Sequence, residues 1–270
     1  WCGREDSNFH GIAPTATSTL RVYQFRHDRK FISISVTRHP YWSGKYQIVN
    51  VIARPTNKML KNSIYWKEAL KEVTDYNFAV TEMEKRVSAI RDEVKPELVW
   101  LLQHPPIYTA GTAAAKSELL DPARFPVFET GRGGRYTYHG PGQLIAYTLI
   151  DLKKRNKDIR TYIYELEQWI IDTLADFNIV GQRRKGRVGI WVIKKTDDNR
   201  QKKDTKIAAI GLRVRKWVTY HGISININPE LQHYSGIVPC GIKEHGVTSL
   251  LDLGIKTDVN EVTHYLKKNF

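Results

Sequence analysis

The stretch VGIWVIKKTDDNRQKKDTKIAAIGLRVRKWVTYHGISININ, residues 188–228, decides the fold class. It contains three runs rich in β-branched and aromatic residues, Val188–Ile193, Ile207–Val214 and Trp217–Asn228. The polar segment KKTDDNRQKKDT between the first two runs predicts an exposed hairpin loop. Strands that follow one another in this way argue against a regular βαβ alternation.

Helical patterns surround this β-rich centre. Tyr76, Val80, Met83, Val87 and Ile90 recur at helical spacing after Asp75, which predicts an amphipathic helix with Asp75 as N-cap. A second helix is predicted from Ile163, Leu166, Ile170, Leu174 and Phe177, closing near Gly181, and a last one opens at Asp258-x-x-Glu261 and runs to the chain end. Leu98–Gln103 and Leu144–Leu152 are further strand candidates. We therefore expect an α/β (α+β) fold with mixed β-sheets flanked by helices.

The composition is that of an ordinary globular protein. The chain has 270 residues, 41% hydrophobic and 26% charged. No apolar run approaches the roughly 18 residues that cross a bilayer, so we expect no membrane span. Cys2 and Cys240 are the only cysteines, which excludes a disulfide scaffold and fits a reducing compartment.

Charge divides the chain into two expected parts. Residues 1–61 hold ten Lys and Arg against three Asp and Glu, and residues 62–270 hold 32 against 25, so each part carries +7 of the total +14. We expect 1–61 to be a basic extension, disordered or loosely attached, and 62–270 to be the catalytic domain. A presequence remnant and a small hairpin made from Phe31–Val36 and Tyr46–Ile52 remain open for the extension. This excess of Lys and Arg over Asp and Glu suits an acidic protein partner.

The densest chemical signal is GRGGRYTYHGPGQ, residues 131–143. Its glycines allow the backbone to approach a ligand closely, and its arginines, tyrosines and His139 supply charge and flat polar walls. The alternative is a tight loop that binds no ligand.

Two further segments carry reactive groups. VPCGIKEHGV, residues 238–247, puts Cys240 in a turn, where it fits a nucleophile as well as a small buried hydrophobe. KIAAIGLRV, residues 206–214, begins with Lys206 at the mouth of a run of small residues, although a lysine at a strand start is usually solvated. A partly desolvated amine there could pair with a thiolate.

Taken together and in this order, RGGRYTYHGPGQ, KIAAIGLRV, WVTYHGISIN and VPCGI resemble the lipoyl(octanoyl) transferase family. The 34-residue separation (240 − 206) of Lys206 and Cys240 and the segment HPPIYTAGT at 104–112 agree with that family. The resemblance covers about 62–270, leaves 1–61 unmatched, and places the chain end a few residues before the family's usual C-terminus. It implies a fold similar to the catalytic domain of biotin and lipoate protein ligases.

The resemblance also implies an activity and its partners. An octanoyl group would pass from octanoyl-acyl carrier protein to a thioester on Cys240. It would then pass to a lysine of the lipoyl domains of 2-oxoacid dehydrogenase E2 subunits or of the glycine-cleavage H protein. Neither ATP nor a metal would be needed, because transfer from thioester to amide is downhill. We expect a cytoplasmic monomer that binds no nucleic acid, or a mitochondrial or plastid protein if 1–61 is a presequence remnant.

The family's site maps onto numbered positions of this chain. Cys240 and Lys206 would be the catalytic dyad, and His139 a supporting residue. The implied substrate-binding residues are Arg132, Gly133, Gly134, Arg135, Tyr136, Thr137, Tyr138, His139, Ala209, Ile210, Gly211, Gly222, Ile223 and Ser224.

Three alternatives remain open on sequence grounds. An ATP-dependent lipoate– or biotin–protein ligase also uses a Gly/Arg-rich loop and a strand lysine, but it does not depend on a nucleophilic thiol. A nucleic-acid-binding module is suggested by the +14 charge, although GQRRKGR at 181–187 and the loop near 194–206 look like solvated loops. A zinc site made from Cys240, His245, His139 and His221 lacks any usual ligand spacing.

Overall fold

The computed structural model describes residues 23–27, 30–34, 64–195, 202–238 and 246–270. The chain divides into two units, residues 1–59 and residues 60–270. In the first unit, β1 (Tyr23–His27) and β2 (Lys30–Ile34) pair as a short antiparallel hairpin. The predicted run Phe31–Val36 overlaps β2, whereas Tyr46–Ile52 lies outside the described residues.

The second unit is built on an eight-stranded sheet. Its strand directions are mixed, as predicted. Its order is β3 (Ile64–Val73), β4 (Glu97–Gln103), β8 (Gln143–Leu149), β12 (Val218–Asn226), β11 (Lys202–Arg215), β10 (Arg187–Lys195) and β9 (Gln182–Arg184), with β13 (Gly246–Val247) beside β11. β3 and β4 are parallel, as are β11 and β13, and the other pairs are antiparallel. A separate three-stranded sheet has the order β6 (Val127–Glu129), β5 (Ile107–Ala110) and β7 (Tyr136–His139).

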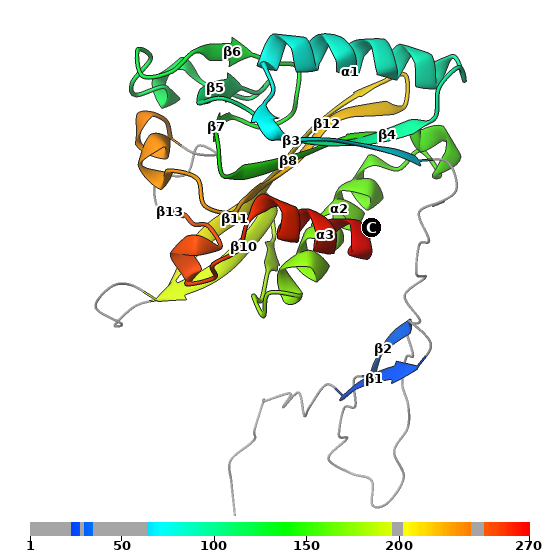
Figure 1. Cartoon of the computed structure of the whole chain (residues 1–270), viewed down its shortest axis with the longest axis vertical. Helices are drawn as coiled ribbons and strands as arrows, with labels where there is room; N and C mark the ends of the chain where they lie inside the picture. Colours follow the sequence, from blue (N-terminus) through cyan, green and yellow to red (C-terminus); the bar gives the residue numbers. More distant parts are fainter. Residues whose placement is uncertain (1–22, 28–29, 35–63, 196–201, 239–245) are drawn as a thin grey trace, which may run out of the picture. The chain divides into compact units, whose positions relative to one another are not determined.

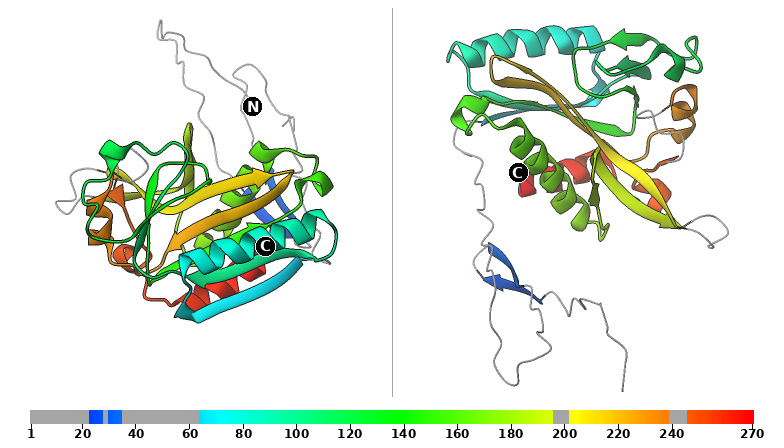
Figure 2. Two further views of the ribbon diagram at one scale, coloured as in Figure 1. Left: turned by 90° about the horizontal axis from the view of Figure 1, so that it is seen from above. Right: turned by 180° about the vertical axis from the view of Figure 1, so that it is seen from behind.

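The large sheet lies between two helical layers. α1 (Tyr76–Arg91) covers one face, beside the small sheet, while α2 (Ile159–Ala175) and α3 (Val259–Asn269) cover the other face (Figures 1 and 2). Alternation along β4 shows why both faces are covered, since Leu98 and Trp100 pack on the α1 side and Val99 on the α2 and α3 side. Short 3-10 helices η2 (Lys116–Glu118), η3 (Leu152–Lys154), η4 (Leu231–Gly236) and η6 (Leu251–Leu253) lie in the connections.

The predicted helix starts are confirmed by their caps. The Asp75 carboxylate accepts the backbone N–H of Phe78 at 2.8 Å, and Asp258 accepts the N–H groups of Asn260 and Glu261, each at 2.9 Å. The capping box at Asp258 is only half formed, because the Glu261 carboxylate accepts the hydroxyl of Thr257 at 2.6 Å.

The predicted end of α2 is wrong by several residues. The helix stops at Ala175, and Asn178 takes the left-handed conformation with φ +58°. Its N–H reaches the Ala175 carbonyl at 3.0 Å, and that of Ile179 reaches Leu174 at 3.0 Å. An asparagine therefore supplies the helix-ending turn that we expected near Gly181.

The polar segment 194–205 is also less of a loop than predicted. β10 and β11 continue to pair through Ile193 with Asp204 and Lys195 with Lys202, so that six residues, 196–201, lie between the two strands. The basic residues at 181–187 form β9 and the start of β10 instead of a solvated loop. Arg183 pairs with Glu167, and Arg184 with Asp204.

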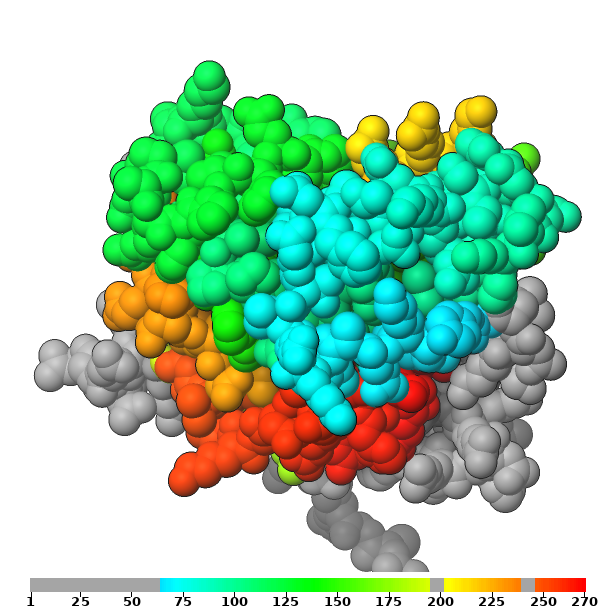
Figure 3. Space-filling view, turned by 45° about the horizontal axis from the view of Figure 1, so that its top comes forward, coloured from blue at the N-terminus to red at the C-terminus, as the bar shows by residue number. Residues whose placement is uncertain are grey.

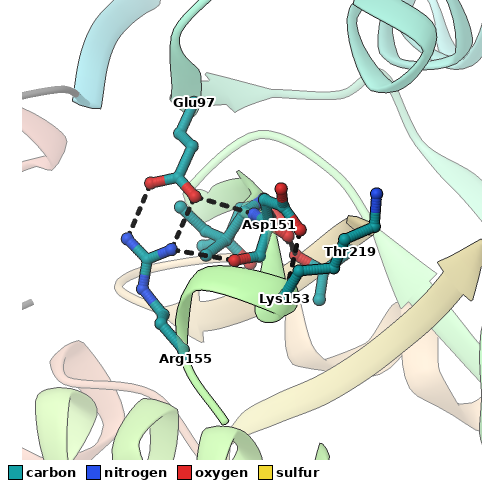
Figure 4. A network of polar contacts seen from close by, with 7 residues as sticks. Glu97, Asp151, Lys153, Arg155 and Thr219 are labelled. Carbon is teal, nitrogen blue, oxygen red and sulfur yellow. Dashed lines mark hydrogen bonds and ion pairs between the residues drawn. The ribbon is translucent and has the colours of Figure 1, made fainter. Parts of the chain in front are cut away.

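Two polar contacts tie distant parts of this unit together. β3 forms one edge of the sheet beside α3, where Glu68 pairs with Lys267 at 2.7 Å and the rings of Trp66 and Phe270 lie 5.0 Å apart. Figure 3 shows these two segments side by side on the surface. Inside the unit, buried Glu97 receives Arg155 at 2.5 and 2.6 Å and the N–H of Asp151 at 2.8 Å (Figure 4).

Candidate active site

A cavity of about 570 Å³ gathers most of the residues predicted as the site. Of the predicted residues that the structure describes, all except Tyr138 line it. Its walls come from the loop before β7, from β8, β11 and β12, from the first turns of α2, and from the β9–β10 turn. Its size is that of an ordinary small-molecule pocket.

The two small-residue triplets face one another in register. Ala209 pairs with Ser224, Ile210 with Ile223 and Gly211 with Gly222 across β11 and β12. A Cβ on Gly222 would lie 2.0 Å from the carbonyl oxygen of Ala146 on β8, so this strand contact requires glycine. A Cβ on Gly211 would lie 3.0 Å from Arg132 Cδ. Together the triplets form a wall of the cavity with few side-chain atoms.

Arg132 holds the glycine-rich loop in place. Its buried guanidinium donates to the Thr109 carbonyl at 2.7 Å and to the carbonyls of Gly133 and Arg135, each at 3.0 Å. The N–H of Gly133 in turn donates to the Leu212 carbonyl at 2.8 Å, which fixes the loop against β11. Arg132 thus joins the loop's own carbonyls to Thr109 on β5 and so supports the cavity wall.

Of the neighbouring predicted residues, some line the cavity and one packs behind its wall. Arg135 is partly exposed and pairs with Glu118 on η2, and Tyr136 and Thr137 line the cavity. Tyr138, predicted as substrate-binding, instead packs into the cluster behind β7, with its hydroxyl 2.8 Å from His233 Nδ1. Its position follows from strand alternation, because Thr137 and His139 occupy the other side of β7.

An amide network fixes the tautomer of His139. Gln143 Nε2 donates to the Asn226 side-chain oxygen at 2.8 Å and to the Tyr138 carbonyl at 3.3 Å. Gln143 Oε1, 2.6 Å from His139 Nδ1, must therefore accept, so Nδ1 carries the hydrogen and Nε2 is the acceptor. Burial lowers the pKa of His139 to about 3, which keeps the ring neutral at physiological pH.

His104 and Tyr147 form a second buried pair beside it. His104 Nδ1 lies 2.6 Å from the Thr74 carbonyl, which can only accept, so Nε2 receives the Tyr147 hydroxyl at 2.6 Å. Burial lowers the pKa of His104 to about 4 and raises the pKa of Tyr147 well above its usual value. Tyr147 lines the cavity, although no sequence motif pointed to it, whereas His104 belongs to the segment HPPIYTAGT.

Other lining residues also escaped the prediction. His221 lines the cavity with φ +61°, and burial lowers its pKa to about 3, whereas the sequence pointed to it only as a zinc ligand. Ile159, Ile163, Val188, Leu212 and Val214 add an apolar wall. Ile163 belongs to the predicted helix pattern, and Val188, Leu212 and Val214 belong to predicted strands, whereas Ile159 belongs to neither. No local signal distinguishes a core residue from one in an apolar cavity wall.

Lys206 is buried and lies inside β11, which begins at Lys202, so it is not the solvated strand-end lysine that the sequence left as the alternative. It pairs in register with Trp191, and its Nζ lies 4.6 Å from the centre of that ring. Nζ also donates to the Val188 carbonyl at 3.1 Å. The amine is thus held at the cavity wall by a π face and a carbonyl.

Cys240 lies outside the described residues. The described chain stops at Val238, whose N–H donates to the Glu118 carbonyl at 2.8 Å, and resumes at Gly246. Val247 is the partner of Lys206 in β13, seven positions after Cys240 (247 − 240). The strand that follows the thiol segment therefore runs beside the lysine.

A metal centre finds no support in the described residues. Within residues 64–195, 202–238 and 246–270 no three His, Cys, Asp or Glu side chains are grouped so that they could hold an ion. Cys240 and His245 of the zinc alternative lie outside those ranges. None of the helices in the described parts is long and apolar enough to cross a membrane.

Comparison with known proteins agrees with this geometry. Residues 75–270 match the family model described as the lipoyl protein ligase A/B catalytic domain. The chain is 57% identical over 202 residues to an octanoyltransferase of Brucella suis, covering 73% of this chain and 75% of that protein. It is 58% identical over 196 residues to an octanoyltransferase of Paramagnetospirillum magneticum, covering 73% and 90%.

Solved structures show the same fold at low identity. A putative lipoate protein ligase of T. acidophilum superposes with a TM-score of 0.55 at 15% identity, covering 76% of this chain and 83% of that one. A lipoate-protein ligase A bound with ATP gives the same values. The expected similarity to lipoate protein ligase catalytic domains is thereby confirmed for the fold.

Proposed function

Because the chain belongs to the lipoyl protein ligase A/B catalytic-domain family and its 57–58% identical relatives are octanoyltransferases, we propose that it transfers an octanoyl group from a carrier-protein thioester to a protein lysine. One observation carries the proposal. A single cavity joins a buried, oriented amine, Lys206, to a wall of small and apolar residues.

The transfer proceeds through a thioester on Cys240. The Cys240 thiolate attacks the donor carbonyl, the bond to the pantetheine sulfur breaks, and that sulfur takes a proton from Lys206. The ε-amine of the acceptor lysine then attacks, the bond to Cys240 breaks, and Lys206 recovers a proton from the attacking amine. The products are an amide and the original thiolate–ammonium pair, so neither ATP nor a metal is consumed.

The charge of Lys206 and the neutral histidines of the site favour these two steps. Lys206 as a cation favours the thiolate form of Cys240. His139, neutral and with Nε2 as acceptor, can receive a hydrogen bond from the incoming amine without competing for its proton. Neutral His104 and His221 add no positive charge around that amine.

The acyl chain fits the wall formed by the two triplets and by Ile159, Ile163 and Val188. Burying its methylenes there contributes roughly 0.8 kcal/mol each, so the depth of the cavity can select chain length. A volume of about 570 Å³ leaves room for eight carbons and part of the donor arm.

We further propose octanoyl-acyl carrier protein as donor, and the lipoyl domains of 2-oxoacid dehydrogenase E2 subunits and the glycine-cleavage H protein as acceptors. A net charge of +14 favours encounter with acidic proteins of this kind.

The test is transfer from octanoyl-acyl carrier protein to an isolated lipoyl domain, followed by intact mass of the acceptor in buffer free of ATP. We expect an octanoyl amide on the acceptor, and no product with Cys240→Ser. Transfer only when ATP and free octanoate are supplied would instead identify a ligase, the alternative that the shared lipoate-ligase fold favours.

A further inference from the structure

One peptide unit links the amine of Lys206 to a buried carboxylate on α2. The carbonyl of the Val188–Gly189 peptide accepts Lys206 Nζ at 3.1 Å, and the N–H of the same peptide donates to Glu167 Oε1 at 3.2 Å. A trans peptide points its C=O and N–H in opposite directions, so ammonium and carboxylate lie at opposite ends of one dipole. Each hydrogen bond polarises the peptide in the direction that strengthens the other.

The backbone at this point is built for that arrangement. β10 is irregular here, because its register with β11 shifts between Ile190 and Trp191. Gly189 has φ +113°, and a Cβ there would lie 2.7 Å from the Ala208 carbonyl and 3.5 Å from Lys206 Nζ. Such an irregularity leaves a residue out of the strand pairing, and here the carbonyl of Val188 accepts the Lys206 amine.

Glu167 is held for this contact. It is buried, with a side chain 10% exposed, and its second oxygen accepts Arg183 Nε at 3.0 Å. With one cationic partner and one backbone N–H donor, both oxygens of this buried carboxylate are hydrogen-bonded, and its orientation is fixed.

We propose that Glu167 is a positioning residue that fixes Lys206 through the Val188–Gly189 peptide, and that it thereby sets the rate of acyl transfer. The proposal rests on the proposed function, since it assigns Lys206 its role. Glu167 does not line the cavity, so its effect on transfer is indirect and passes through the Val188–Gly189 peptide.

The experiment compares three substitutions of Glu167. Glu167→Met removes the acceptor oxygen, Glu167→Asp keeps the carboxylate on a side chain one methylene shorter, and Glu167→Gln keeps one acceptor oxygen without the charge. We expect Met, and less strongly Asp, to lower kcat by about ten- to hundredfold with donor KM within about threefold, because a misplaced catalytic group costs rate more than binding. Gln should restore most of the rate. Glu84→Gln, an exposed position on α1 away from the cavity, is the control and should behave as wild type.

A second readout separates positioning from general loosening. The rate at which iodoacetamide alkylates Cys240 is measured against pH, in the wild-type and Lys206→Ala backgrounds. Glu167→Met should move this profile to higher pH in the wild type and add no further shift in Lys206→Ala. Thermal unfolding of each variant shows that it is folded. If Glu167→Met does not fold, Glu167→Asp is used for the same comparison of pH profiles.

The outcomes are distinguishable. An equal shift on adding Glu167→Met in both backgrounds, or a kcat within twofold of wild type for both Met and Asp, overturns the positioning proposal. If Lys206→Ala alone leaves transfer and the alkylation profile unchanged, the thiol–amine mechanism itself fails, and that result requires no Glu167 variant.

Discussion

Glu97→Gln should destabilise the residue 60–270 unit without affecting acyl transfer. The Glu97 carboxylate, 3% exposed, receives Arg155 at 2.5 and 2.6 Å and the Asp151 N–H at 2.8 Å. It joins the start of β4 to the end of β8, next to the turn between β11 and β12, where the Leu152 N–H donates to the Trp217 carbonyl at 2.8 Å. The amide would leave the Arg155 guanidinium, 12% exposed, without its negative partner.

The expected cost follows from that burial. Removing one member of a buried pair costs about 3–5 kcal/mol, and because an amide keeps one acceptor oxygen we take the lower end, about 3 kcal/mol. For a unit of this length each kcal/mol shifts Tm by roughly 2–4 °C, which gives a fall of about 6–12 °C. Glu68→Gln is the matched control, because the Glu68–Lys267 pair is 42% exposed on both sides and should be worth less than about 1 kcal/mol.

Differential scanning calorimetry or urea unfolding measures both variants. A loss below about 1 kcal/mol for Glu97→Gln, equal to that of Glu68→Gln, would show that burial does not strengthen the Glu97–Arg155 pair. Transfer assayed well below Tm should be unchanged, since neither residue lines the cavity.

Three further changes test the site and its surroundings. Lys206→Ala should slow acylation of Cys240 and raise the pH at which an alkylating probe reacts with it; an unchanged alkylation profile would remove the thiol–amine coupling. Ala209→Leu fills the cavity wall with three carbons, which at roughly 0.8 kcal/mol each should reduce octanoyl transfer about fiftyfold while sparing butyryl transfer. The exposed control Ala123→Leu should transfer both chains like the wild type, and equal loss of both chains in Ala209→Leu would contradict a length-selecting slot. Arg184 and Arg187 lower the pKa of Asp204 to about 2, so its contribution to stability is complete above pH 3.8 and disappears as the pH falls through about 2. The stability difference between wild type and Asp204→Asn should therefore shrink from pH 5 to pH 2, and a constant difference would argue against this ion pair.

Much of the fold could be predicted because its signals are local. The helix after Asp75 follows from apolar spacing and one capping side chain, and both are confirmed. The end of α2 could not be predicted, because Asn178 takes a backbone conformation for which Gly181 seemed the natural candidate. The pairing of Lys195 with Lys202 is equally hidden, since like charges and polar residues indicate a loop.

The site was predictable where residues cluster in sequence and hidden where they meet across the fold. The triplets at Ala209 and Gly222 stood out through the family resemblance, and the antiparallel register explains why they face each other. The contact of His104 with Tyr147 spans 43 positions, and no spacing rule predicts it. Glu167 has the pattern of a charged residue on an amphipathic helix, and its partner in β10 is the backbone N–H of Gly189, a contact that no spacing rule predicts.

The mechanism that we propose requires Cys240 to carry the acyl group. Its most direct test is the intact mass of the enzyme mixed with octanoyl-acyl carrier protein alone, without ATP and without acceptor, followed by tryptic mapping. We expect one octanoyl adduct, cleaved by hydroxylamine, on the peptide 217–243 that contains Cys240, and none with Cys240→Ser. Transfer to the acceptor by an enzyme that never forms this adduct would contradict it.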